Sequence, residues 1–157
     1  MLKNKQKTYR IQISAATENL QIIRSFIQEV ARKAGFNDEQ IDQIKLAVDE
    51  ACTNAIKHAY HFDASKMIDL QIRLDSKKID ITITDNGPGF NPERLDQPDI
   101  NKNARKAKPG GLGIHLMKTL MDDVRFHIIP GQKTEVHLIK YRSDHKKQKS
   151  DLPEVNA

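Results

Sequence analysis

The chain has 157 residues and a mass of 17.9 kDa, which fits one domain, because a single domain usually runs to roughly 100–200 residues. With 38% hydrophobic residues the chain can build a core, so disorder along its whole length is excluded. No apolar run approaches the roughly 20 residues of a membrane helix, and the first residues lack the apolar stretch of a signal peptide. We therefore expect a soluble, cytoplasmic protein.

The net charge of +5 is unevenly distributed. Residues 1–10 and 101–108 carry basic residues without acids and together contribute +8, so the rest of the chain sums to −3. Only 5% of the residues are aromatic, which leaves little for stacking on bases. Nucleic-acid binding is therefore disfavoured. The single cysteine, Cys52, has no partner for a disulfide or a metal cluster, and we expect it to be a small core residue in a reducing compartment.

The first 35 residues predict one strand and one helix. Apolar and polar residues alternate over residues 8–14, as in a half-buried strand. Apolar residues then recur at three- and four-residue steps, which predicts a helix capped by Thr17 and stopped by Gly35.

A second helix and a hairpin are expected next. Asn37 with Gln40 has the pattern of a capping box, and the apolar stripe that follows continues to about Tyr60. Two alternating runs over residues 68–74 and 79–83, joined by polar residues, predict a β-hairpin.

The last third of the chain begins with a polar segment over residues 91–109, which is long for a loop in a compact domain unless it is functional. A helix is expected over residues 112–120, followed by strands over residues 124–128 and 136–138. Residues 143–157 are polar and are expected to be a loose tail. The order of elements predicts an α+β fold, a two-layer sandwich with helices on one face of a mostly antiparallel mixed sheet.

The second helix carries the first candidate cluster, DEACTNAIKHAY at residues 49–60. Glu50, Asn54 and His58 are four residues apart and so share one face of a helix, with Lys57 beside Asn54. A carboxylate can take a proton, and an amide oxygen can ligate a hard cation such as Mg²⁺. The same spacing also occurs on plain solvated helix edges.

Two glycine-containing segments form the other candidate clusters. DNGPGF follows a strand, where Asp85 can accept a hydrogen bond from a ligand amino group and Gly87 and Gly89 allow a tight turn. PGGLG, residues 109–113, opens a helix, and bare amides there can cradle a phosphate. Taken alone, the first is also read as an ordinary turn and the second as a glycine hinge. No P-loop or G-x-G-x-x-G pattern is present.

In this order the three clusters resemble the N, G1 and G2 boxes of the GHKL ATPase superfamily, and within it the bacterial anti-sigma factor serine kinases. The resemblance runs from the first strand to about Arg142 and is carried by EACTNAIKHAY, DNGPGF, GGLGIHLMKTLMDDV and TEVHLIKY. It implies a histidine-kinase-like ATPase domain over residues 1–142, with residues 91–109 as the ATP lid. Asn91 departs from the family, which often has Asp there.

The resemblance also implies roles for single residues. Glu50 matches the general base, Asn54 the Mg²⁺ ligand and Asp85 the aspartate that reads adenine. His58 is expected to pack under the site in a supporting role. Further residues implied to contact the nucleotide are Lys57, Gly87, Gly89, Gly110, Gly111, Leu112, Gly113 and Thr134.

By the same resemblance, the chain is expected to use ATP and Mg²⁺ to phosphorylate a serine of an anti-sigma-factor antagonist and to sequester a sigma factor, as a homodimer. Three alternatives stay open at this point: a nucleotide-binding switch module without kinase activity, the catalytic domain of a histidine kinase, and a stand-alone ATPase. The histidine-kinase alternative is weakened because few residues precede the second helix to form a dimerisation hairpin.

Overall fold

The structure, a computed structural model, describes residues 5–87 and 111–142. The expected lid over residues 91–109, the glycines at 89 and 110, and the tail over residues 143–157 lie outside the described residues.

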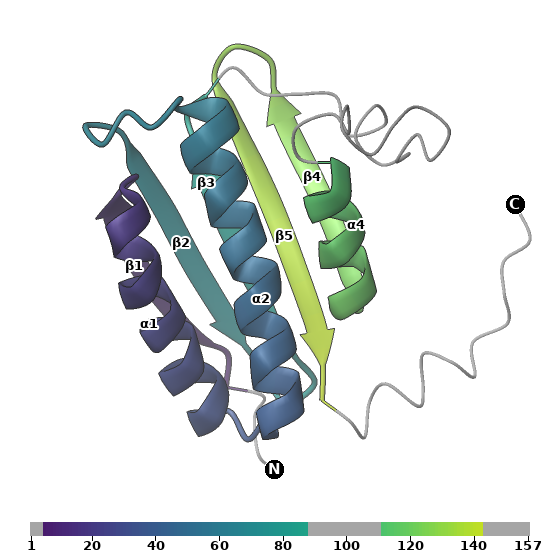
Figure 1. The fold of residues 1–157 in the computed structure, drawn as a ribbon. Helices are drawn as coiled ribbons and strands as arrows, with labels where there is room; N and C mark the ends of the chain where they lie inside the picture. The colour runs from purple at the N-terminus through teal and green to yellow at the C-terminus, as the bar shows by residue number, and fades with distance from the viewer. Residues whose placement is uncertain (1–4, 88–110, 143–157) are drawn as a thin grey trace, which may run out of the picture.

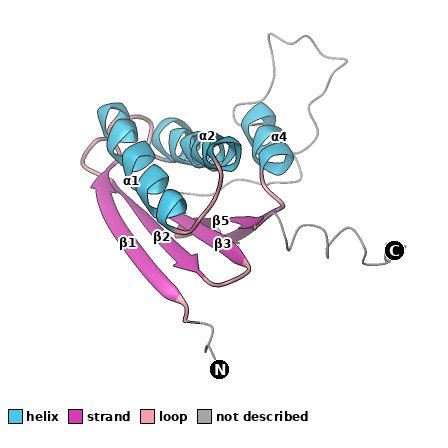
Figure 2. Cartoon of the chain, turned by 90° about the horizontal axis from the view of Figure 1, so that it is seen from below, coloured by secondary structure: helices cyan, strands magenta, loops and turns pink. Residues whose placement is uncertain are grey.

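The described strands form one five-stranded sheet in the order β1-β2-β3-β5-β4. All four pairings among them are antiparallel. Three helices lie side by side on one face of this sheet, so the fold has two layers (Figures 1 and 2). The predicted α+β sandwich is confirmed. The strands are β1 (Lys7–Ser14), β2 (Met67–Leu74), β3 (Lys78–Asp85), β4 (Asp123–Ile129) and β5 (Lys133–Tyr141).

The core lies between the two layers. Alternate residues of β2 and β3 point toward the helices and are fully buried, because a strand turns every second side chain to the same face. Helices α1 (Leu20–Lys33), α2 (Asp38–Asn54) and α4 (Gly111–Leu120) cover them. Cys52 is 0% exposed and belongs to this core, as predicted, and burial raises the pKa of its thiol.

The helix starts show one correct and one wrong prediction. Asn37 and Gln40 form a capping box, with Gln40 N donating to Asn37 Oδ1 at 2.8 Å and Asn37 N donating to Gln40 Oε1 at 3.1 Å. Thr17 does not cap α1; it begins a short 3₁₀ turn, Thr17–Asn19, that precedes this helix. Gly35 ends the first helical region with φ of 90°, which glycine adopts without strain.

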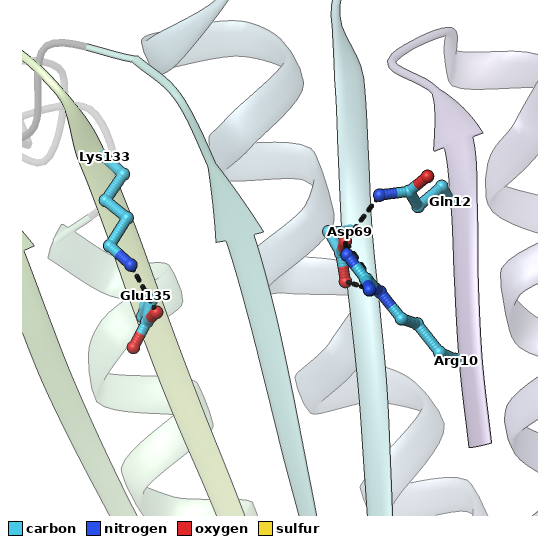
Figure 3. Close-up of polar contacts among 5 residues, drawn as sticks. All are labelled: Arg10, Gln12, Asp69, Lys133 and Glu135. Carbon is cyan, nitrogen blue, oxygen red and sulfur yellow. Dashed lines mark hydrogen bonds and ion pairs between the residues drawn. The ribbon is translucent and has the colours of Figure 1, made fainter. Parts of the chain in front are cut away.

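The other face of the sheet carries polar contacts between neighbouring strands and within one strand (Figure 3). Asp69 on β2 accepts hydrogen bonds from Arg10 Nε at 3.0 Å and Gln12 Nε2 at 2.8 Å, both on the edge strand β1. The hydrogen bond from Arg10 lowers the pKa of the Asp69 carboxyl. On β5, Lys133 Nζ lies 3.0 Å from Glu135 Oε1. Within residues 5–87 and 111–142, no helix combines the length and apolar character that crossing a membrane requires.

Candidate functional site

The first and third clusters meet where α4 packs against α2. An ideal Cβ built on Gly113 would lie 2.8 Å from Glu50 Oε2, 3.5 Å from Asn54 Nδ2 and 3.6 Å from Asn54 Oδ1. The helix edge and the glycine segment, about sixty residues apart in sequence, are therefore in direct contact. Because position 113 has no side chain, the Glu50 and Asn54 head groups can lie against the first turn of α4.

The second cluster meets the same helical region from the other side. A Cβ on Gly87 would lie 2.5 Å from Ala59 Cβ and 2.9 Å from Asp85 Oδ1. The Gly87 backbone N–H donates to Asp85 Oδ1 at 2.9 Å, which holds the carboxylate at the start of the turn. The turn after β3 thus sits against the end of the helical segment that carries the first cluster.

A pocket opens between the helices and the ends of β3 and β5. The empty space there, including the open mouth, is about 440 Å³. It is lined by Ala51, Asn54, Ala55, His58, Ala59, Asp85, Met117, Phe126, Thr134 and Val136. The walls are mostly apolar, with a few polar groups, as in many sites for small molecules.

Two polar residues share the floor of this pocket. Asp85 on β3 pairs with Thr134 on β5 in the sheet register, so their side chains stand next to each other. Both are buried, and burial raises the pKa of the Asp85 carboxyl while the Gly87 N–H opposes the rise. Thr134 Oγ1 is buried without a hydrogen-bond partner among the described residues. An orphaned hydroxyl beside a buried carboxylate fits a site that is completed by a polar ligand.

The helix that carries Glu50 and Asn54 changes its winding in the wall of the pocket. The α-helix ends at Asn54, and the chain continues as a π-helical turn, Ala55–Ala59. The helical segment ends near Tyr60, as the apolar stripe predicts, but the stripe does not indicate the widened turn. Wide turns of this kind are frequent at functional sites, and composition alone gives no signal for them.

The remaining predicted residues differ in their placement. His58 lines the pocket but is exposed, so the expectation that it packs under the site is wrong; its pKa is lowered by partial burial and by Lys57 and His61. Lys57 is exposed beside it, and Leu112 is 61% exposed at the start of α4. Gly111 is the first residue of α4.

The donor groups suit a nucleotide and its cation. Mg²⁺ prefers oxygen ligands and is commonly held by one or two protein groups together with substrate phosphates. The described residues contain no cluster of three or more His, Cys, Asp or Glu side chains that could hold a metal by themselves. The amide oxygen of Asn54, next to Glu50, is compatible with a cation that is shared with phosphates.

The model of the histidine kinase-like ATPase domain matches residues 13–140 of this chain. The chain belongs to the histidine kinase-like ATPase family. The matched region contains every described residue of the candidate site, and membership implies the use of ATP.

Curated relatives refine the assignment. The serine-protein kinase RsbW of Listeria monocytogenes is 33% identical over 135 residues, which cover 83% of this chain and 85% of the relative. The protein of the same name from Bacillus subtilis is 32% identical over 129 residues, covering 79% and 80%. The chain therefore belongs to the serine-protein kinase branch of the family.

Solved structures share the fold. The crystal structure of the RsbU and RsbW domains of a Mycobacterium tuberculosis protein superposes with a TM-score of 0.63 at 18% identity. This likeness covers 87% of the chain and about a third, 33%, of that longer protein. The histidine kinase domain of a blue-light activated kinase from Erythrobacter litoralis gives 0.51 at 22% identity, covering 85% and 64%.

Proposed function

We propose that the chain is a kinase that phosphorylates a serine of an anti-sigma-factor antagonist and that it sequesters a sigma factor in a partner switch. The observation that carries the catalytic half of this proposal is the contact of Gly113 with both Glu50 and Asn54. It joins a proton acceptor, an oxygen ligand and the amide-rich start of a helix in one place.

Each group then has one task. Asp85 accepts a hydrogen bond from the adenine amino group, Thr134 supplies its free hydroxyl nearby, and Gly87 shapes the turn beneath the base. At the other end, the backbone of Gly111 and Gly113 faces the phosphates, because bare N–H groups at a helix start attract anions. On the basis of the family resemblance alone, Gly89 is proposed to share the turn beneath the base with Gly87. On the same basis, Lys57 is proposed to contact phosphate, and Gly110 and Leu112 to contact the nucleotide.

For phosphoryl transfer the protein has mainly to position the two reactants and to stabilise the charge on the phosphates. Asn54 would hold Mg²⁺, which when bound neutralises charge on the phosphates. Glu50 takes the proton from the serine hydroxyl as the hydroxyl oxygen bonds to the γ-phosphorus. The bond from phosphorus to the oxygen of ADP breaks in the same displacement, so the products are phosphoserine and ADP.

The partners follow from the family and not from the site. The proposal includes a homodimer that acts in the cytoplasm, where a sigma factor would be found. A nucleotide-binding switch without kinase activity is the rival proposal, and the presence of Glu50 and Asn54 in contact with Gly113 argues against it.

The test is transfer of labelled phosphate from ATP to a candidate antagonist. In Glu50→Gln we expect transfer to fall by roughly a hundredfold or more while nucleotide binding is kept, because only the proton acceptor is lost. Glu39→Gln, an exposed acid in the first turn of the same helix, is the matched control and should transfer at the parental rate. Label that never reaches a partner would favour the switch module, and an unimpaired Glu50→Gln would remove Glu50 from its role.

A further inference from the structure

The ladder between β2 and β3 stops before the two strands end. Its first pair is Asp69 with Thr84, although β2 begins at Met67 and β3 runs to Asp85. If the antiparallel pairing continued for two more residues along each strand, Met67 would pair with Asn86. The ends of the two strands therefore part at the point where the turn under the pocket begins.

The hydroxyl of Tyr60 occupies this gap. It donates to the Met67 carbonyl at 2.8 Å and accepts from the Asn86 backbone N–H at 2.7 Å. These are the acceptor and the donor that would approach each other if the ladder continued. Burial raises the pKa of the hydroxyl, which keeps it protonated and able to serve both groups. The Tyr60 hydroxyl thus provides a hydrogen-bond partner for one backbone group of each strand and keeps the two strands apart.

The backbone on both sides of Tyr60 has unusual conformations. The preceding π turn is closed by the Tyr60 N–H donating to the Ala55 carbonyl at 2.9 Å. His61 and Phe62 follow with φ of 48° and 64°, and the Phe62 N–H donates to the Ile56 carbonyl at 2.8 Å. Two consecutive left-handed residues, one of them a bulky aromatic, persist only where their surroundings fix them, and such strain gathers at functional sites.

Asn86 lies between Asp85, which is part of the pocket floor, and Gly87, which is in the turn after β3. Before it is Asp85, whose carboxylate accepts from the Gly87 N–H; after it is Gly87, which packs on Ala59. A peptide group fixed at Asn86 therefore fixes both neighbours. Without the hydroxyl, the Asn86 N–H would be unpaired or would close onto the Met67 carbonyl, and either change would move the turn.

We propose that Tyr60 is a positioning residue for base recognition: its hydroxyl ends the β2–β3 ladder and so aims the Asp85 carboxylate and the Gly87 turn at the base of the nucleotide. The inference rests on the proposed role of Asp85 in reading adenine. It adds a specificity determinant that does not itself touch the ligand.

The test compares the affinities of full-length Tyr60→Phe and parental protein for ATP and for GTP by calorimetry. GTP has a carbonyl where adenine has its amino group, so a displaced Asp85 weakens ATP binding more than GTP binding. We expect ATP affinity to fall about fivefold to tenfold, as for one lost hydrogen bond, and the preference for ATP to shrink. Amide exchange at Asn86, followed by NMR, should become faster. Tyr9→Phe, which alters a partly buried tyrosine on β1, should change none of these values.

A folded Tyr60→Phe protein that prefers ATP as strongly as the parental protein overturns the inference alone. A parental protein that binds neither nucleotide overturns the proposed function and the inference with it. Should Tyr60→Phe fail to fold, replacing Asn86 with its α-hydroxy acid analogue removes only the N–H that bonds to Tyr60 and keeps every side chain. The same loss of ATP preference is expected there, and an unchanged preference would again contradict the role of Tyr60.

Discussion

Gly113 on α4 and Glu50 on α2 are so close that a methyl group on residue 113 would lie 2.8 Å from Glu50 Oε2. The atom that would be displaced is the end of a flexible side chain, so the clash can be relieved without moving either helix. The contact therefore constrains the position of the carboxylate more than it constrains the fold.

The first prediction follows for Gly113→Ala. Its melting temperature should equal or exceed that of the parental protein, because alanine favours a helix over glycine by about 1 kcal/mol. Phosphoryl transfer should fall by roughly tenfold or more, since a proton acceptor displaced by about 1 Å loses its alignment. Thermal unfolding and a single-turnover transfer assay measure the two effects, and full activity in a stable variant would contradict the prediction.

Gly87→Ala should behave differently. Its Cβ would meet Ala59 Cβ at 2.5 Å and Ala59 Cα at 3.1 Å, which are rigid parts of a helical turn. We expect a loss of about 1–3 kcal/mol in the free energy of unfolding in urea, together with weaker nucleotide binding. Adding Ala59→Gly should restore part of the stability by removing the nearest contact; a double variant no better than the single one would show that the clash lies elsewhere.

Asp85→Ala should weaken ATP binding by about 1.5–3 kcal/mol, the range for hydrogen bonds to a charged acceptor. Because burial raises the pKa of Asp85, the carboxylate of the parental protein loses its charge at a higher pH than an ordinary aspartate. The affinity difference between parental and variant protein should therefore shrink on mild acidification. Calorimetry across pH measures this, and an affinity that is equal at neutral pH would exclude Asp85 from base recognition.

Thr134→Val should change the stability of the protein and its affinity for ATP in opposite directions. Removing a buried hydroxyl without a partner among the described residues should raise the free energy of unfolding by about 1 kcal/mol, while ATP affinity falls because the ligand loses that hydroxyl. Thr82→Val is the matched control: its Oγ1 lies 3.1 Å from His137 Nδ1, so it should lose stability and keep its affinity. The prediction fails if both variants change in the same direction.

Asp69 should contribute to stability in a pH-dependent way. Its pKa is lowered in the folded protein, chiefly by the hydrogen bond from Arg10, so its contribution is present at neutral pH and is lost as the pH falls through the lowered value. Asp69→Asn should accordingly unfold at lower urea than the parental protein at pH 7. The difference should begin to shrink as the pH falls to about 4, near the ordinary pKa of aspartate, and should be gone once the pH is below the lowered pKa of the folded state. A difference that persists in acid would assign the effect to packing.

The sheet and the outline of the site were predictable because they depend on local patterns. Alternation in β2 and β3 reports directly which side chains are buried, and the Asn37–Gln40 capping box is a local hydrogen-bond pattern. The three motifs could be ordered along the chain, and the structure brings their described parts together at Gly113 and Gly87.

The features that were missed depend on contacts between distant segments. The π turn and the left-handed residues at 61 and 62 flank Tyr60, whose hydroxyl bonds to two strands that lie far away in sequence. The bulky Phe62 has no local preference for its positive φ. Thr17 has a good capping side chain, yet Ala16 takes the position before the first helical turn. His58 follows Glu50 and Asn54 at the four-residue spacing of one helix face. It is exposed, and it lies in the widened turn, which that spacing does not predict.

The burial of Cys52 has a practical consequence. As the sole thiol of the chain, fully enclosed and with its ionisation suppressed, it should stay unreactive toward alkylating dyes while the protein is folded. A fluorophore could therefore be attached at a newly introduced surface cysteine without first deleting the native one. Delayed labelling of the native thiol would in turn record how often the whole molecule opens.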